Sequence, residues 1–217
     1  TDTDSLVEYG LDETYGQQIS DSTPTTIHEI TLTDLEPETI YHYRVSSGDF
    51  ISGDLSFSTA IHSITPYRFV VYGDSRSYPE THEKVMQGIY NQNPFLVFNT
   101  GDVVSDGLVR EQWQDQHFDV VRRLNHYVPY FIAIGNHEKN SPYYYDFLAY
   151  PDEENYYSFS YGNSYFLVID SESPGFNLAF GPEIEWLHQE LASQECQEAT
   201  WRFALFHQPT YTNLCDR

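Results

Sequence analysis

The feature that most constrains the fold of this chain is a set of four apolar runs, each followed at once by a short polar cluster. The runs are typical of buried strands and cover residues 68–72, 95–99, 130–134 and 201–206. The clusters are Gly73-Asp74-Ser75-Arg76, Gly101-Asp102, Gly135-Asn136-His137-Glu138 and Phe206-His207-Gln208-Pro209. Because the carboxyl ends of neighbouring strands border one crevice in an open α/β sheet, we expect the four clusters to converge.

The converging side chains are those of a metal site. Asp74 and Asp102 supply carboxylates, Asn136 an amide oxygen and His207 an imidazole. Two carboxylates packed together near neutral pH repel each other unless a cation lies between them. A carboxylate shared by two cations, with a second carboxylate on one of them, would hold a dinuclear centre with ~3.5–4 Å between the ions. The imidazole favours zinc, iron or manganese over calcium.

The chain divides into two parts by its pattern. Up to about residue 60, short alternating segments at 26–32 and 41–45 predict strands, with Pro37 in a turn between them. From Arg68 onward strands alternate with helices, which we expect at 79–91, 111–124 and 182–193. This alternation favours an α/β core. The aromatic residues of 143–161 either pack loops and hairpins or form a wall of the substrate cleft.

Composition excludes some classes of partner. The chain has 33 acidic against 10 basic residues and a formal net charge of -23, so its surface repels nucleic-acid backbones and anionic membranes. No run approaches the ~18 apolar residues of a membrane span, and no basic-then-apolar leader precedes the first strand. Cys196 and Cys215 either pair, which would suit an oxidising compartment, or are unrelated thiols.

The four clusters, in this order, resemble the motifs of the calcineurin-like metallophosphoesterase superfamily, and Gly-Asn-His-Glu is the most specific of them. The first part resembles the end of a fibronectin type III-like sandwich, with a Leu35-to-Pro37 corner, Tyr41-x-Tyr43 and Phe57-x-Thr59. Together they are similar to purple acid phosphatases. The resemblance implies a partial fibronectin type III-like β-sandwich over 1–62 and a four-layer αββα core over 67–217. It also implies that both ends are truncated, because the first strands of the sandwich are expected upstream of Thr1 and the family's closing Gly-His-x-His motif beyond Arg217.

The resemblance implies a role for each site residue. Asp102 would bridge two transition-metal ions (Fe, Zn or Mn), Asp74 would hold the first ion, and Asn136 and His207 the second. A metal-bound hydroxide would attack phosphorus in line. His137 would contact the phosphoryl oxygens and help to protonate the leaving alkoxide.

Two positions depart from the family pattern. The superfamily often has histidine where this chain has Arg76, and purple acid phosphatases have tyrosine where it has Ser105. His82 is a tentative replacement ligand or else a histidine on a helix surface. Arg76 is either a bidentate clamp on substrate phosphate, and so a catalytic residue, or a structural partner of Asp106 or another nearby acid.

The leading hypothesis is metal-dependent hydrolysis of phosphate esters, with phosphomonoesters first and phosphodiesters or nucleotides as alternatives. The substrate would be a small phosphorylated molecule, and the family resemblance implies a secreted, periplasmic or cell-surface location. A second hypothesis is a non-catalytic secreted binding protein with a degenerate phosphatase-like domain, because Arg76 and Ser105 replace expected ligands.

Overall fold

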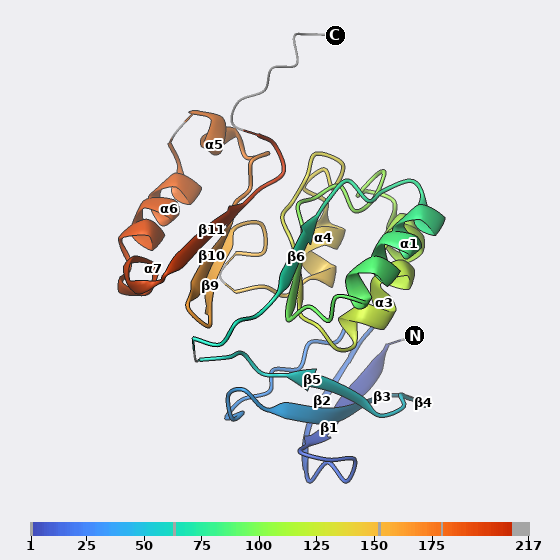
Figure 1. The fold of residues 1–217 in the computed structure, drawn as a ribbon. Coiled ribbons are helices and arrows are strands. Elements are labelled where there is room, and N and C mark those ends of the chain that lie inside the picture. The colour runs from blue at the N-terminus through green and yellow to red at the C-terminus, as the bar shows by residue number, and fades with distance from the viewer. Residues whose placement is uncertain (1, 63, 152, 179, 210–217) are drawn as a thin grey trace.

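The first part of the chain forms one antiparallel sheet, seen at the bottom of Figure 1. The computed structural model describes residues 2–62, 64–151, 153–178 and 180–209. Within this sheet the strand order is β2-β1-β3-β4, and β5 pairs with β3. The strands are β1 (Thr3–Gly10), β2 (Gln17–Thr25), β3 (Ile40–Ser47), β4 (Phe50–Ile51) and β5 (Leu55–Ser58). The strand predicted at 41–45 is therefore the middle of β3.

The strand predicted at 26–32 is wrong, because this segment pairs with no strand. Its alternation has another cause. His28, Ile30 and Leu32 are half-buried and line one cavity together with Val7 of β1 and Tyr43 of β3. The segment thus lays alternate side chains over the sheet without joining its hydrogen-bond ladder. The alternation with a period of two residues reflects which side chains face the sheet. It does not reflect hydrogen bonding between strand backbones.

The second part consists of two facing sheets with helices outside each, visible edge-on in Figure 1. One sheet has the order β6-β7-β8, all parallel; the other has the order β11-β10-β9, with β10 and β11 parallel and β9 antiparallel. The strands are β6 (Phe69–Tyr72), β7 (Leu96–Asn99), β8 (Tyr130–Ile132), β9 (Tyr157–Tyr161), β10 (Ser164–Val168) and β11 (Trp201–Leu205).

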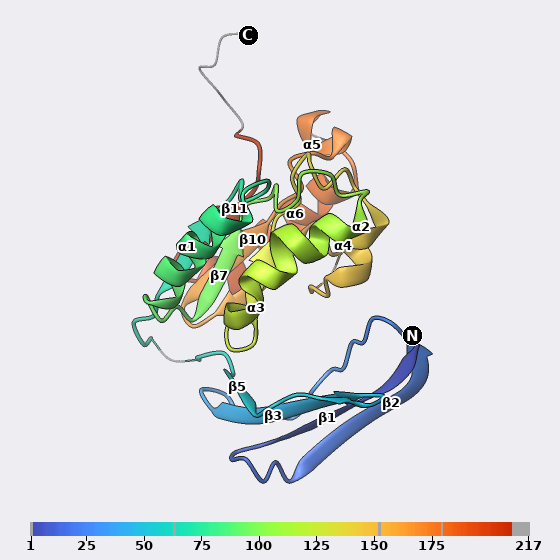
Figure 2. The same cartoon turned by 90° about the vertical axis from the view of Figure 1, so that its right-hand side faces the viewer.

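Helices cover the outer faces of both sheets. In Figures 1 and 2, α1 and α3 lie outside the β6-β7-β8 sheet, and α6 and α7 lie outside the other sheet. The expected four-layer αββα arrangement is confirmed. The helices are α1 (Pro79–Tyr90), α2 (Arg110–Gln112), the π-helix η1 (Trp113–Phe118), α3 (Asp119–Asn125), α4 (Pro142–Phe147), α5 (Pro174–Leu178), α6 (Pro182–Ala192) and α7 (Gln194–Glu198).

Aromatic packing between the two sheets forms the main core. Phe98 of β7 and Phe166 of β10 are fully buried and stack with ring centroids 4.9 Å apart. All four residues of β7 are buried, as expected of a central parallel strand covered on both faces. On the helix side of the same sheet, Met86 and Ile89 of α1 pack with Val97. This packing fixes the strand ends that carry the polar clusters.

The helix predicted at 111–124 is interrupted. The structure has α2, then the π-helix η1, then α3. A π-turn inserts an extra residue into a helical ladder and often marks a functional site. Trp113 begins this turn, is fully buried, and donates its indole N–H to the carbonyl of Gly107 at 2.9 Å.

The aromatic segment serves packing. Tyr144 and Tyr157 are fully buried, and their hydroxyls donate to the carbonyl of Ile132 at 2.9 and 3.2 Å.

Among the described residues, no helix is both long and apolar enough to cross a membrane.

Candidate metal centre

The four polar clusters meet at the carboxyl ends of their strands. Asp74 follows β6, Asp102 follows β7, Asn136 follows β8 and His207 follows β11. Ligand atoms of Asp74, Asp102 and His207 all lie within 4.8 Å of one another. Asn136 joins them, because its Oδ1 lies 3.2 Å from His207 Nε2. The structure therefore brings together four of the five residues predicted as metal ligands, all but the tentative His82.

The loops that carry the two aspartates have strained backbones and are joined by hydrogen bonds. Asp74 and Asp102 have φ values of 52° and 59°, in the left-handed region that non-glycine residues seldom adopt. Such strain persists only where surrounding contacts enforce it, and it clusters at functional sites. Here the enforcing contacts run between loops: Asp74 N donates to Gly101 O at 3.0 Å, and Arg76 N donates to Asp102 O at 3.1 Å.

Glycine is required where these loops touch. Gly101 has a φ of 100°, and a Cβ there would lie 2.9 Å from the carbonyl oxygen of Ala133. A Cβ on Gly135 would lie 2.6 Å from Asp102 Oδ1. Side chains at either position would push the Asp102 loop away from the end of β8. The glycines in these clusters thus allow the close approach of the ligand-bearing loops.

The donor and acceptor pattern at His207 fits a bound cation. Nδ1 of the ring donates to the carbonyl of Thr100 at 2.8 Å, so Nε2 of the neutral ring carries a lone pair. That lone pair faces two further acceptors, Asn136 Oδ1 at 3.2 Å and Asp102 Oδ1 at 3.5 Å. Gln208 Nε2 donates to Asn136 Oδ1 at 3.2 Å and His137 N donates to Asp102 Oδ1 at 2.9 Å, and a cation bound between the three acceptor atoms would relieve their remaining mutual repulsion. An imidazole nitrogen with a carboxylate and an amide oxygen suits a transition metal.

Glu138 holds the Asp102 loop in place from inside the protein. It is fully buried and accepts three backbone N–H bonds, from Asp102 at 2.9 Å, Val103 at 2.8 Å and Gly135 at 2.7 Å. Burial raises the pKa of this carboxyl, while the three N–H donors act in the opposite direction. One side chain therefore ties the loop after β7 to the loop after β8.

His137 is oriented by backbone contacts on both sides. Its N–H donates to Asp102 Oδ1 at 2.9 Å, and its ring Nδ1 donates to the carbonyl of Ser105 at 2.7 Å. Gln116 of the π-helix fixes that serine, because its Oε1 accepts from Ser105 N at 2.9 Å. The same oxygen accepts from Ser77 N at 3.3 Å. This leaves Nε2 of His137 for other partners.

Comparison with known proteins identifies the family. The family described as calcineurin-like phosphoesterase matches residues 67–217. The chain belongs to this family.

Relatives of this chain include purple acid phosphatases. An acid phosphatase type 7 from Danio rerio is 26% identical over 255 residues, covering 99% of this chain and 55% of its own length. Purple acid phosphatase 15 from Arabidopsis thaliana is 27% identical, covering 86% of this chain and 42% of its own length. The chain thus spans about half the length of these relatives.

A solved purple acid phosphatase from yellow lupin (Lupinus luteus) seeds shares the fold. It superposes with a TM-score of 0.75 at 20% identity, covering 95% of this chain and 46% of its own. The match extends through the first sheet as well as the αββα core, in line with the expected sandwich-plus-phosphoesterase architecture.

Arg76 lies among the carboxylates of the candidate centre. Its Nη1 is 2.9 Å from Asp74 Oδ1 and 2.5 Å from Asp102 Oδ2. Asp106, the other acid considered, instead pairs with Lys139 at 2.7 Å. The guanidinium therefore faces the candidate centre.

His82 is not brought to the centre. It is buried on α1, where its Nε2 lies 2.7 Å from the Tyr72 hydroxyl and its Nδ1 lies 3.4 Å from Gln116 O. Burial lowers the pKa of this histidine. It belongs to a polar network beneath the loops, so we leave it out of the proposed ligand set. Cys196 is a buried free thiol, and Cys215 lies outside the described residues.

Two positioning residues had no role in the sequence-based site. Glu138 belongs to the Gly-Asn-His-Glu motif. Its spacing from Gly135 could have indicated its role, because a carboxylate three residues later can reach the Gly135 N–H. Gln116 gave no signal, because the helical period through 111–124 does not reveal a π-turn.

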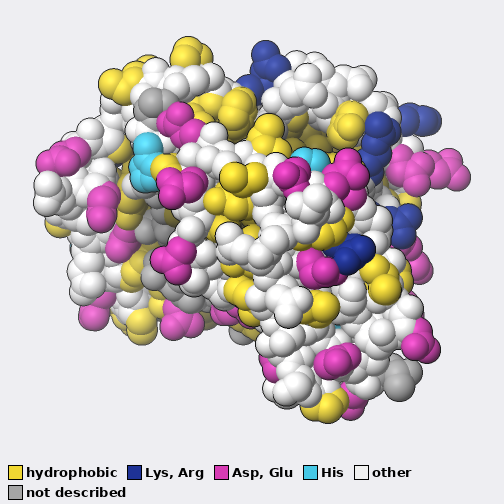
Figure 3. All heavy atoms as spheres, turned by 90° about the horizontal axis from the view of Figure 1, so that it is seen from below, with side chains coloured by type: hydrophobic (Ala, Val, Ile, Leu, Met, Phe, Trp, Pro, Cys, Tyr) yellow, Lys and Arg dark blue, Asp and Glu magenta, His cyan; other side chains and the backbone are white. Residues whose placement is uncertain are grey.

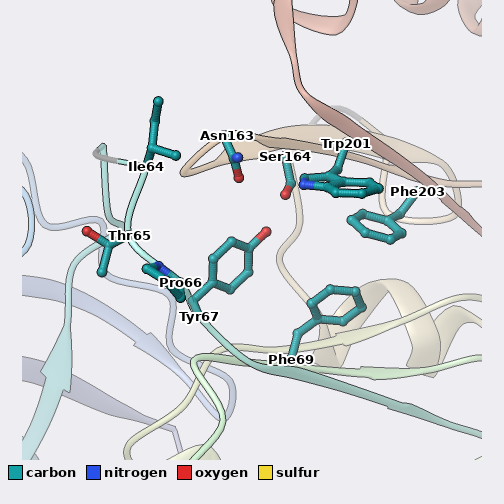
Figure 4. A pocket seen from close by; sticks show the side chains of 9 residues that line it. All are labelled: Ile64, Thr65, Pro66, Tyr67, Phe69, Asn163, Ser164, Trp201 and Phe203. Atoms are coloured by element: carbon teal, nitrogen blue, oxygen red, sulfur yellow. The ribbon is translucent and has the colours of Figure 1, made fainter.

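A second hollow lies away from these residues. Figure 4 shows an aromatic groove lined by residues that include Tyr67, Phe69 and Trp201. Tyr67 and Phe69 lie at the amino end of β6 and Trp201 begins β11, whereas the polar clusters follow the carboxyl ends of these strands. The groove is therefore separate from the candidate centre.

Proposed function

We propose that this calcineurin-like phosphoesterase hydrolyses phosphate esters, phosphomonoesters foremost, at a transition-metal centre held by Asp74, Asp102, Asn136 and His207. The observation that carries this proposal is the meeting of His207 Nε2 with Asn136 Oδ1 and Asp102 Oδ1 at 3.2 and 3.5 Å. Iron, zinc or manganese suits these ligands. The expectation of two ions per chain stays a prediction. The position of Arg76 affects how many ions the site can hold.

Each site residue would have a distinct task. A bound transition ion would supply Lewis acidity and lower the pKa of a bound water toward neutrality. Arg76 carries N–H groups besides the one on the aspartates, and these would hold phosphoryl oxygens of the substrate. His137 Nδ1 donates to Ser105 O and leaves Nε2 without another partner among the described residues, so the doubly protonated ring would give its Nε2 proton to the leaving alkoxide and keep the Nδ1 proton on Ser105 O.

The surface favours a small substrate rather than a polyanion. Acidic side chains are spread over the face shown in Figure 3 rather than gathered in one patch, consistent with the net charge of -23. A long nucleic acid would meet repulsion over much of such a surface, whereas one phosphoryl group needs local positive charge only. We also propose a secreted, periplasmic or cell-surface location, on the family resemblance, which fractionation of the source cells would test.

The test is turnover of p-nitrophenyl phosphate by the purified protein in its natural full-length form with Zn²⁺, Mn²⁺ or Fe added. Asp102→Ala should reduce kcat by at least about 1000-fold, because the most buried ligand carboxylate is lost. Asp115→Ala, an exposed aspartate on the π-helix, is the matched control and should retain activity. Equal turnover by Asp102→Ala and wild type would refute the site. Faster turnover of bis(p-nitrophenyl) phosphate would instead favour a phosphodiesterase.

A further inference from the structure

A single nitrogen of Arg76 lies between the two carboxylates of the proposed centre. Nη1 is 2.9 Å from Asp74 Oδ1 and 2.5 Å from Asp102 Oδ2. The Asp102 side chain is only 2% exposed, so protein groups rather than water compensate its charge. A guanidinium stays protonated at any physiological pH. Arg76 is therefore a permanent cation at this end of the site.

The two oxygens of Asp102 face different partners. Oδ2 faces Arg76 at 2.5 Å, whereas Oδ1 lies 3.5 Å from His207 Nε2. A carboxylate that bridges two cations divides its oxygens in this way. At one end the guanidinium of Arg76 supplies the cation. At the other end the acceptor atoms of His207 and Asn136 would bind a transition ion.

The backbone fixes this arrangement. Arg76 N donates to Asp102 O at 3.1 Å, so the arginine side chain starts beside the aspartate that it pairs with. Ser105 does not compete for the position, because its hydroxyl donates to Gln116 Oε1 at 2.9 Å and lies 2.7 Å from the Ser77 hydroxyl. Among the described residues, the carboxylates gathered with His207 are those of Asp74 and Asp102, and one oxygen of each already contacts Arg76 Nη1.

Resting on the proposed function, we infer that Arg76 replaces one metal ion of a two-ion centre. The protein then binds a single transition ion, at the end formed by Asp102 Oδ1, Asn136 and His207. A second divalent ion between Asp74 and Asp102 would have to expel the guanidinium from both carboxylates, because two cations at one position repel. The remaining N–H groups of Arg76 would contact the phosphoryl oxygens that a second ion would otherwise hold.

The test counts ions rather than turnover. The full-length protein is dialysed to equilibrium against Mn²⁺, its metal content is measured by mass spectrometry, and its Mn²⁺ signal is recorded by electron paramagnetic resonance. Wild type should bind roughly one ion with the spectrum of an isolated Mn²⁺. Arg76→His, which removes the guanidinium and adds a ligand, should bind a second ion and show a spin-coupled pair. Arg122→Ala, an exposed arginine on α3, should behave as wild type.

The outcomes separate this inference from the proposed function. Two coupled ions in wild type would overturn the inference even if Arg76→His fails to fold, and metal-dependent turnover in the same sample would leave the proposed function standing. One ion in both wild type and a folded Arg76→His variant would also overturn it. No bound ion together with no metal-dependent turnover would remove the proposed function and the inference with it.

Discussion

Glu138 shows how one buried side chain sets the geometry of several others. Its Oε2 accepts from Asp102 N and Gly135 N, and its Oε1 accepts from Val103 N. In Glu138→Gln the amide NH₂ must face at least one of these donors, whichever way it turns. We expect a loss of ~1–3 kcal/mol in the free energy of unfolding, the cost of buried groups left unpaired. Urea denaturation measures it, and Glu111→Gln, an exposed glutamate on α2, is the control.

The same substitution should weaken metal binding, because the Asp102 loop loses its anchor. Isothermal titration with Zn²⁺ should give a dissociation constant raised about 10- to 100-fold over wild type. A variant with unchanged stability and unchanged affinity would show that Glu138 does not position the loop.

Residue types and strand-end positions were enough to predict which polar side chains meet. Asp74, Asp102, Asn136 and His207 each follow an apolar run, and parallel strands bring such ends together. The side-chain partners were beyond the sequence. His82 was a tentative ligand and Arg76 either a phosphate clamp or a structural partner of an acid, yet His82 lies on the buried face of α1 and Arg76 pairs with Asp74 and Asp102. Which way a side chain turns depends on tertiary contacts that a local pattern does not contain.

At the scale of elements, Glu183 gives α6 a pH-dependent contact. It lies in the first turn of α6, is buried, and its Oε1 accepts from Asp170 N at 2.8 Å. Burial raises the pKa of Glu183 to about 7, and the nearby Asp170 carboxylate acts in the same direction. A folded-state pKa above the unfolded value means that the folded protein holds its proton longer, so stability falls as pH rises from about 4.5 through about 7.

The substitution Glu183→Gln should remove this loss of stability at high pH. The amide keeps the acceptor for Asp170 N and has no charge to bury, so we expect the variant to gain stability over wild type at pH 8 and none at pH 4.5. Urea midpoints at the two pH values measure the difference. Glu185→Gln, exposed in the same turn, should follow the wild-type profile. A Glu183→Gln variant with the wild-type slope would exclude Glu183 as the titrating group.

Elements with one apolar face were predictable within a residue or two, and irregular ones were not. The helices expected at 79–91 and 182–193 appear as α1 and α6, because a helical period reports the face that packs on a sheet. The π-turn at 113–118 keeps apolar residues close to that period, so the sequence hides it. β2 is exposed along most of its length and contains Pro24, so it shows no alternation to predict.

At the scale of the whole molecule, the order of the motifs predicted the family. It also predicted the αββα layers, because four strand ends that meet must lie along one sheet edge or along two facing edges. We propose that the chain divides into two domains, 1–62 and 67–217. The support for this division is that β1 to β5 pair only with one another among the described strands. The described contacts between the parts include a hydrogen bond from the Tyr43 hydroxyl to His126 O at 2.9 Å.

If the two parts are domains, the segment between them should be the first site of limited proteolysis. Ile64 is 85% exposed, whereas Ile61 is buried and its carbonyl accepts from Gly162 N at 2.9 Å. Thermolysin, which cuts before apolar residues, should therefore cleave at Ile64 well before it cuts within β1, β3 or β7. Ile64→Asp should slow this first cut without changing later ones. The fragment that contains 67–217 should resist further digestion, because its core between the sheets contains no residue of β1 to β5 and loses only Ile61 to the cut. First cuts inside β7, or digestion of the fragment as soon as it forms, would show that the chain folds as one cooperative unit.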